Sequence, residues 1–540
     1  MTVQYPSRTL TLSAGVDVDM SQLFLADDFE CTASEPINDI HVWASFRDDM
    51  LPEDGPGSLT FEISIYSDIP AVGGQRALEP GVTLLKHLGA IILTFTGTFC
   101  LIMGLLLDMP GRRKQGRIKV DEYHSTWEPT DKPFDTNWYG HDSGYNFYCI
   151  YDYCSRFYDM SRLNTPLDDA AVQNCDVLVV KVPTSRYDPE EIKTIERFVE
   201  QGGGLLLIGE HTNVFNTGTH INDIAKIFGF SFRYDCLFDI DTIYTQLYSL
   251  PLVPHPIIQS MLPFNFAVSC SIDPGRSLGR AVIRFTSLKN LLADYHASNF
   301  YPQVEDKAEM RYGAFVQLLT ARHGAGRVVA FTDSTVFSNF ATFEPGKAEL
   351  MLGMLEWLNR HNSPYPLRLL LILLGFLFLA GGLALCRRPN VAWLIVVSAG
   401  VLGWAIAVMS TRAIHKYSMP LPKAVRPMVE VVVDRTVCDA PLSRSGFIAG
   451  TRDGFGIFER WILRLGYFTS RKRGTDALSG ELIVFPHPNQ DGHERVPQGA
   501  GQLCRIGRKS AHPRFAGEHR VNCEQPAVSV RPECESKHAY

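Results

Sequence analysis

The 540-residue sequence lacks the short motifs that usually reveal a metal, redox or nucleotide site. Its 12 cysteines form no CxxC pair and no zinc-finger spacing, and Cys149 and Cys154 lie five positions apart. We therefore expect mostly buried free thiols. A Walker lysine motif is also missing, because Gly202–Gly204 precedes a strand and is typical of a helix end rather than a phosphate-binding loop.

The sequence also lacks an excess of positive charge. It has 51 Lys and Arg against 58 Asp and Glu, so the formal net charge is −7, and we expect no nucleic-acid partner. Residues 1–20 lack the apolar segment of a signal peptide, so we expect no cleaved export signal. The hydrophobic fraction of 45% nevertheless excludes a wholly disordered chain.

Three long uncharged runs hold many of the apolar residues: Leu88–Leu107, Leu369–Cys386 and Val391–Ser410. Each is about long enough to cross a hydrocarbon core of about 30 Å. Buried core helices are the alternative, which three uncharged runs of this length disfavour. We therefore predict three transmembrane helices with the lipid bilayer as partner, the last two forming a hairpin with a turn at 387–390.

The predicted hairpin returns the chain to the side that it left. The segments 111–366 and 411–540 should therefore face the same compartment. Basic clusters after the first and third runs favour the cytoplasm for both segments, whereas Arg387 and Arg388 in the turn favour the opposite orientation. The sidedness stays open at this level, with a preference for the cytoplasm.

The segment 111–366 alternates between strand and helix patterns. A helix is predicted to begin after Asp188, because Asp188 is a good N-cap residue and Pro189 suits the first turn. Strands that alternate with helices predict an α/β domain with a doubly wound parallel sheet. The predicted strands are Arg117–Asp121, Asp176–Pro183, Leu205–Gly209 and Gly326–Thr332, and a final helix is predicted at Lys347–Asn359.

Parallel sheets bind ligands at the carboxyl ends of their strands. Acidic, imidazole and hydroxyl side chains follow three of the predicted strands, so we expect them to gather at one edge. These candidate ligand-binding residues are Asp121, Glu122, His124, His141, Asp142, Glu210, His211, Thr212, Asn213, Asp333 and Ser334.

Two interpretations of this edge remain open. The side chains form a polar-ligand or divalent-metal site, or Thr212, Asn213 and Ser334 merely cap helical turns. No cofactor is indicated, because the spacing of the acidic and histidine residues does not demand a metal. The turn Gly209-Glu210-His211 holds neither serine nor cysteine, so covalent acyl chemistry is not expected.

These residues resemble a known family. The blocks DVLVVKVPTSRYDPEEIKTIERFVEQGGGLLLIGEHTN (176–213) and GRVVAFTDSTVFSNF (326–340) are similar to the class I glutamine amidotransferase-like domain of bacterial gliding-motility and ABC-transporter auxiliary proteins. The resemblance covers roughly 117–360. It implies a flavodoxin-like sheet in a multi-pass protein of the bacterial inner membrane, usually without the amidotransferase cysteine. Here Glu210 stands at that position.

A second, partial copy of the pattern follows the third uncharged run. Residues 429–434 (VEVVVD) are expected to form a strand, 455–467 a helix, and ELIVFPHPN (481–489) matches DVLVVKVPT (176–184) without a gap. We interpret 425–490 as part of a second α/β domain. The tail 491–540 has no strand or helix period, and two hypotheses remain for it: a disordered tail or an out-of-frame or truncated copy.

The first 80 residues have a different character. Residues 22–70 alternate polar and apolar side chains, as strands do, and resemble the opening of a β-rich domain of secreted bacterial proteins. The segment is shorter than a full sandwich of about 100 residues. We therefore predict a partial β-rich module at 1–80, with a small cytosolic module as the alternative.

The sequence leads to two functional hypotheses. The first is a non-catalytic, membrane-anchored binding or scaffold protein that assists a transporter or envelope system. The second is a metal-assisted hydrolase that uses Asp121, His124, Glu210 and His211. A transporter proper is disfavoured, because the three uncharged runs contain no charge that would mark a transport pathway.

Overall fold

The computed structural model contains two compact units, Met1–Glu79 and Pro80–Tyr540. It describes residues 2–5, 8–11, 40–41, 80–133, 144–241, 246–294, 308–342, 344–362, 366–385, 389–436, 458–459, 462 and 465–486. In the first unit, the antiparallel strands β1 (Thr2–Tyr5), β2 (Arg8–Thr11) and β3 (Ile40–His41) pair in the order β2-β1-β3. Most of the predicted strand region 22–70 lies outside the described residues.

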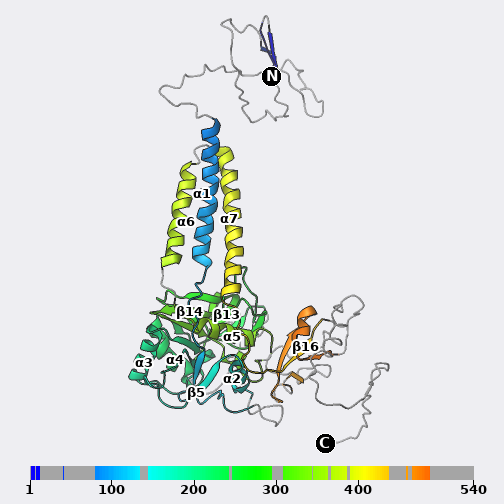
Figure 1. Ribbon diagram of the computed structural model, residues 1–540. Coiled ribbons are helices and arrows are strands. Elements are labelled where there is room, and N and C mark those ends of the chain that lie inside the picture. The colour runs from blue at the N-terminus through cyan, green and yellow to red at the C-terminus, as the bar shows by residue number, and fades with distance from the viewer. Residues whose placement is uncertain are drawn as a thin grey trace, which may run out of the picture. The chain divides into compact units, whose positions relative to one another are not determined.

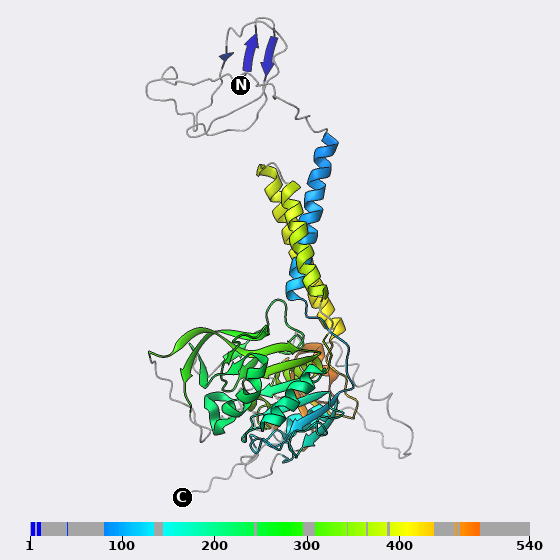
Figure 2. The same ribbon diagram turned by 90° about the vertical axis from the view of Figure 1, so that its left-hand side faces the viewer.

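Three long apolar helices flank the main α/β part of the second unit in the sequence: one precedes it and two follow it. They are α1 (Pro80–Leu106), α6 (Pro366–Leu385) and α7 (Pro389–Ser418), and they run side by side in Figure 1 and Figure 2. By length and composition, each is long and apolar enough to cross a membrane. The third predicted transmembrane helix ended too early at Ser410, since α7 continues to Ser418. The added residues include basic side chains, which suit the carboxyl end of a helix.

Glycines allow these helices to approach closely. A Cβ on Gly97 of α1 would lie 2.7 Å from the backbone nitrogen of Leu379, and one on Gly375 of α6 would lie 2.7 Å from that of Leu101. A Cβ on Gly403 of α7 would lie 2.6 Å from the carbonyl oxygen of Phe95. Small residues at such crossings are typical of helices packed within a bilayer.

The α/β part is built on one mixed sheet in the order β5-β4-β6-β7-β15-β14-β12-β8, with β13 and β9 attached through β14. The first five strands are parallel. They are β4 (Arg117–Asp121), β5 (Asp159–Leu163), β6 (Val177–Lys181), β7 (Gly204–Ile208) and β15 (Gly326–Phe331); the rest are β8 (Ser231–Phe232), β9 (Asp235–Asp239), β12 (Ile272–Asp273), β13 (Arg280–Leu292) and β14 (Arg311–His323).

The prediction of a parallel sheet is therefore right for only part of it. β14 pairs antiparallel to β15, because a two-residue turn at Gly324–Ala325 joins them. Such a short link permits only an antiparallel pair, whereas a parallel pair needs a long crossover. The largely parallel half is consistent with a flavodoxin-like fold. A separate hairpin pairs β10 (Gln246–Tyr248) with β11 (Phe264–Phe266).

Helices cover both faces of the parallel strands. Val177 and Val179 of β6 belong to a core that includes residues of α5 (Lys347–Leu358), whereas Leu178 and Val180 belong to a core with α3 (Pro189–Glu200). Successive side chains of a strand point to opposite faces, which explains the continuous apolar runs. The remaining helices and 3-10 turns are α2 (Tyr148–Ser155), α4 (Thr217–Ala225), η4 (His211–Asn216), η5 (Lys226–Phe228), η6 (Ser334–Phe337) and η7 (Gly474–Ser479).

Gly353 of α5 provides a test of this packing. A Cβ there would lie 2.0 Å from the carbonyl oxygen of Ile257. Alanine ordinarily stabilises a helix by about 1 kcal/mol relative to glycine. The steric clash should outweigh this gain, so we expect Gly353→Ala to lower the free energy of unfolding by about 1–3 kcal/mol in denaturant titrations of the full chain. Gly400→Ala is the control, since its Cβ would lie 3.7 Å from Thr98 Oγ1; an equal loss in both variants would contradict the prediction.

A smaller parallel sheet follows α7. It contains β16 (Glu430–Asp434), β17 (Phe468–Lys472) and β18 (Leu482–Val484) in the order β17-β16-β18, which corresponds to β5-β4-β6. The registers also correspond: Val432 pairs with Ile483 as Lys119 pairs with Leu178. β17 was not predicted. The expected helix 455–467 is described in part, and 487–540 lies outside the described residues.

Candidate functional site

The carboxyl ends of the parallel strands bring several predicted residues to one edge of the sheet. Asp121 is the last residue of β4, Glu210 follows β7 by two positions, and Asp333 follows β15 by two positions. Because β7 and β15 are hydrogen-bonded neighbours, Glu210 and Asp333 start adjacent loops.

Asp121 and His124 belong to one buried group, which we call the His124 cluster. His124 Nδ1 lies 2.9 Å from Asp121 Oδ2, and His124 Nε2 lies 3.2 Å from Glu191 Oε2. The Tyr187 hydroxyl donates to Asp121 Oδ2 at 2.6 Å, and its ring stacks on the imidazole. Burial disfavours the imidazolium, but the hydrogen bonds and charges of Asp121 and Glu191 outweigh it and raise the pKa of His124.

The contacts of the His124 cluster also link the β4 loop to α3. Glu191 accepts a hydrogen bond from the backbone N–H of Asp188 at 2.7 Å, and α3 begins at Pro189 as predicted. Both ring nitrogens of His124 face carboxylates within 3.2 Å. The cluster therefore holds the loop after β4 against the start of α3.

Glu210 belongs to a second buried group, in which its carboxylate caps η6. Glu210 Oε2 accepts hydrogen bonds from the backbone N–H groups of Ser334 at 3.1 Å and Thr335 at 3.3 Å, and from the Ser334 hydroxyl at 2.5 Å. Asp333 Oδ1 accepts from the N–H of Val336 at 3.3 Å. The capping interpretation is thus corrected for Ser334, because the acids Glu210 and Asp333 accept the bonds.

Glu128 is a third member of this group, which we call the Glu210 cluster, and sequence reasoning missed it. Its Oε1 lies 3.0 Å from Ser334 Oγ, and its buried Oε2 has no hydrogen-bond partner among the described residues. Ser334 has one hydroxyl proton, so it can donate to only one of the two carboxyl groups at a time. A protonated Glu128 that donates to Ser334 satisfies both contacts.

The pKa values of the Glu210 cluster support this proton sharing. Burial raises the pKa of Glu210 to about 7, although the hydrogen bonds from Ser334, His211 and Thr335 act against it. Burial and the nearby charge of Glu210 raise the pKa of both Glu128 and Asp333 well above the usual range. Carboxyl groups this close and this buried cannot all ionise near neutral pH.

Lys181 supplies a buried positive charge near the two clusters. It is the last residue of β6, and its Nζ donates to Ser125 Oγ at 3.2 Å and lies 3.5 Å from Glu122 Oε1. Burial lowers the pKa of Lys181, while the charges of Glu122 and Glu128 act in the opposite direction. Glu122 also accepts a hydrogen bond from the Thr130 hydroxyl at 2.7 Å. These contacts fix Glu122, a predicted ligand-binding residue, as an internal ion-pair partner.

The segment after Glu210 has a strained backbone. Thr212, Asn213, Phe215 and Asn216 have φ values between 51° and 60°, a region that favours glycine. Such residues cost of the order of 1–3 kcal/mol each and tend to occur at functional sites. Asn213 partly offsets this cost by accepting a hydrogen bond from the N–H of Thr219 at 2.9 Å, which is the helix-capping role considered for it.

A groove of about 420 Å³ lies at the same edge of the sheet. Thr126, Trp127, Thr184 and Phe215 line it, and they come from the loops after β4, β6 and β7. Trp127 and Phe215 pack edge to face with ring centroids 5.0 Å apart, and the two threonine hydroxyls lie 2.9 Å apart. The accessible surface at this edge is therefore aromatic and hydroxyl-rich, while the predicted acids lie buried.

The structure thus places the predicted ligand-binding residues in separate groups and not in one site. Asp121 and His124 lie in one cluster, Glu210, Asp333 and Ser334 in another, and His211 Nδ1 contacts Thr212 Oγ1 at 2.8 Å. His141 and Asp142 lie outside the described residues. Within the described part of the chain, one group of metal-ligating side chains has its ligand atoms within 4.8 Å of one another, and it contains none of the predicted residues.

Comparisons with known proteins give matches over parts of the chain. A model described as a domain of unknown function, DUF4350, matches residues 155–355, and a second, DUF7901, matches residues 3–94. A comparison with curated protein sequences finds no match.

Solved structures resemble the chain weakly. The mmIFT52 N-terminal domain is 12% identical, with a TM-score of 0.35 over 46% of this chain and 99% of its own. A cytoplasmic protein from Salmonella typhimurium is 13% identical, with a TM-score of 0.27 over 46% of this chain and 100% of its own. A ThuA-like protein from Bacteroides uniformis is 12% identical, with a TM-score of 0.26 over 46% and 94%.

Proposed function

We propose that this chain is a membrane-anchored, non-catalytic binding or scaffold protein whose amidotransferase-like α/β domain receives a polar ligand or partner at the carboxyl edge of its sheet. The three apolar helices would anchor it in the bacterial inner membrane, with 111–366 and 411–540 on the same side. Its sequence resemblance to transporter auxiliary proteins suggests a transporter or envelope system as the partner.

The observation that carries this proposal is the burial and hydrogen bonding of Glu210. An amidotransferase or esterase of this architecture needs a nucleophile at the turn after the strand. Here that position holds a carboxylate that is 1% exposed and that accepts four hydrogen bonds from Ser334 and Thr335. The group therefore serves to join two loops.

Four of the described cysteines give the same indication. Burial raises the pKa of Cys149 and of Cys154, and it raises the pKa of Cys236 and Cys270 well above the usual range. A catalytic cysteine instead needs a lowered pKa and access to solvent. These four thiols pack as small apolar groups within the described part of the chain.

The groove offers a surface for non-covalent recognition. Trp127 and Phe215 present ring surface, and Thr126 and Thr184 present hydroxyls that donate and accept hydrogen bonds. This combination suits a ligand or partner segment with an apolar face and polar edges. The strained segment that carries Phe215 follows Glu210 directly in the chain, so the buried contacts of Glu210 would hold this part of the groove in shape.

A photo-crosslinking amino acid at Thr126, in the full chain in its native membranes, tests this proposal. We expect a discrete adduct from position 126, its loss on Trp127→Ala, and no such adduct when the label replaces Leu278, a fully exposed residue elsewhere. Identical products from both positions would contradict the groove. Hydrolysis of glutamine by the purified chain that disappears in Glu210→Gln would contradict the non-catalytic assignment.

The alternative, a hydrolase, draws on one specific observation. Burial raises the pKa of Glu210 to about 7, which suits a general acid or base at neutral pH, and the buried Oε2 of Glu128 has no hydrogen-bond partner among the described residues. Stoichiometric zinc or manganese in the full chain that is lost on His211→Ala would favour this alternative over the scaffold.

A further inference from the structure

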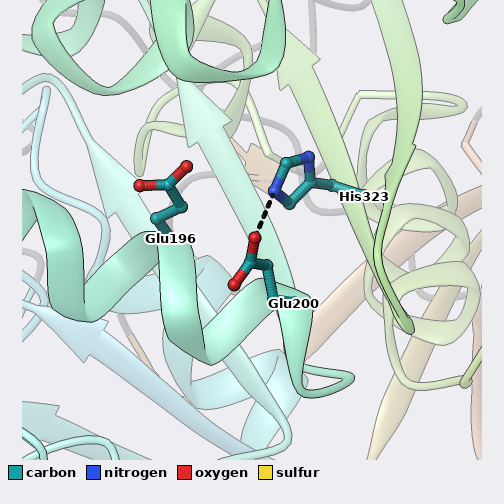
Figure 3. A group of neighbouring side chains, drawn as sticks. All are labelled: Glu196, Glu200 and His323. Carbon is teal, nitrogen blue, oxygen red and sulfur yellow. Dashed lines mark ion pairs between the residues drawn. The ribbon is translucent and has the colours of Figure 1, made fainter.

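We propose that Glu196, Glu200 and His323 form a site for a divalent transition-metal ion. Glu196 and Glu200 lie in the last turns of α3, and His323 is the last residue of β14. One ligand atom from each residue lies within 4.8 Å of the other two, which suits three ligands around one ion. Figure 3 shows the side chains from the helix and the strand converging.

Glu200 is exposed, whereas His323 and Glu196 are half-buried and have few partners among the described residues. His323 Nε2 is buried and has no hydrogen-bond partner in the described part of the chain, and its ion pair with Glu200 Oε1 is 3.4 Å long. Glu196 is half-buried, and its carboxylate forms no hydrogen bond or ion pair with any described residue. A bound cation would satisfy both the nitrogen and the carboxylate.

The position of Glu196 and Glu200 on α3 also favours a bound cation. Like charges four residues apart destabilise a helix, and negative charges near its carboxyl end oppose the helix dipole. The neighbouring Arg197 is engaged with Asp169 at 2.9 Å. A cation held between Glu196 and Glu200 would remove both repulsions.

The backbone fixes the site before any ion binds. The N–H of Ala325 donates to the carbonyl oxygen of Glu200 at 2.9 Å, which joins the turn after His323 to the end of α3. A Cβ on Gly324 would lie 2.6 Å from that same carbonyl oxygen, so the two segments are in close contact. The ring of Phe228 packs edge to face on His323 with centroids 5.2 Å apart, which holds the imidazole.

The ligand set indicates the class of ion. One imidazole and two carboxylates suit Zn²⁺ or Mn²⁺, whereas Mg²⁺ and Ca²⁺ prefer oxygen ligands alone. The site lies near the amino ends of β7 and β15, at the opposite edge of the sheet from Glu210. Its existence is therefore independent of the proposed function.

Metal titration of the full chain tests the proposal. The chain, purified in detergent without a histidine tag, is stripped with a chelator and dialysed against Zn²⁺ or Mn²⁺, and bound metal is measured by mass spectrometry. We expect about one retained ion, an affinity at least tenfold weaker in Glu196→Gln, Glu200→Gln and His323→Gln, and no change in Glu190→Gln, an exposed residue at the start of α3. Metal should also slow hydrogen exchange at the Ala325 amide.

Two results would overturn the site. One is metal retention that is the same in the wild type, His323→Gln and Glu190→Gln, which would place the ion elsewhere. The other is the absence of retained Zn²⁺ and Mn²⁺ from a wild-type chain whose circular dichroism is that of a folded protein. Loss of metal on His211→Ala but not on His323→Gln would instead support the hydrolase alternative.

Discussion

Replacing Asp108 with alanine should lower the free energy of unfolding of the α/β domain by about 3–5 kcal/mol. Asp108 follows α1 and is buried, and it pairs with Arg322, accepts a hydrogen bond from the indole of Trp357, and lies 3.2 Å from His255 Nε2. Burial opposes its charge, but His255, Arg322 and Arg327 outweigh burial and hold the pKa of Asp108 well below its usual range.

The loss would be large because Asp108 balances buried positive charge. Arg327 is fully buried and stacks over Trp357, and its guanidinium donates to the carbonyl oxygens of Met109 and Pro110. Without the carboxylate, Arg322 and Arg327 would stay close together with no anion between them. Leaving one member of a buried ion pair costs far more than the pair itself contributes.

Native-state hydrogen exchange in β14 and β15, with the full chain in detergent, would measure this loss. Asp273→Ala is a matched control, because Asp273 pairs with Arg233 at 3.0 Å at the surface, where it is 45% exposed. A surface pair of this kind contributes about 0–1 kcal/mol. Equal losses in the two variants would show that Asp108 does not balance the buried arginines.

The Glu210 carboxyl group should add stability as the pH falls from 8 to 5, and Glu210→Gln should remove that contribution. The folded-state pKa of Glu210 is about 7, against an ordinary value of 4.5. A carboxyl group with a raised folded-state pKa contributes stability that is complete below about 4.5 and is lost as the pH rises through about 7. The gap between these values corresponds to about 3 kcal/mol.

Other groups should leave a smaller slope in the variant, although burial lowers the pKa of His255, which removes stability at low pH. The raised pKa values of Glu128, Asp333 and His124 all add stability at low pH. Denaturant midpoints at pH 5 and pH 8 would measure the effect, with Glu190→Gln at the exposed start of α3 as the control. A pH slope that is unchanged in Glu210→Gln would show that this carboxyl group ionises normally in the fold.

Much of the fold follows from local sequence signals. The strands β4, β6, β7 and β15 lie within one or two residues of their predicted ends, because continuous apolar runs with polar flanks are typical of buried parallel strands. Pro189 begins α3 as its flanking acids indicate. The antiparallel half of the sheet was missed, since the strands from β8 to β14 carry mixed burial patterns and pair with partners distant in sequence.

The sequence predicted where the candidate site lies in the sheet, but not which side chains contact one another there. The rule that strand carboxyl ends meet at one edge correctly brings Glu210 and Asp333 to adjacent loops. It could not reveal that Glu128, from a different loop, shares Ser334 with Glu210, or that His124 contacts Glu191. Those contacts join residues 67 to 206 positions apart, and no local pattern encodes them.

By itself, the sequence determined the three apolar helices, the parallel strands and the absence of a nucleophile at Glu210, because run length, periodicity and residue identity are local properties. The tertiary structure alone decided what the polar residues do. It placed Glu210, Glu128 and Ser334 in one buried network, Asp108 among arginines, and His323 beside Glu200. Charge pairing and burial depend on which distant segments pack together, and that is set by the folded chain as a whole.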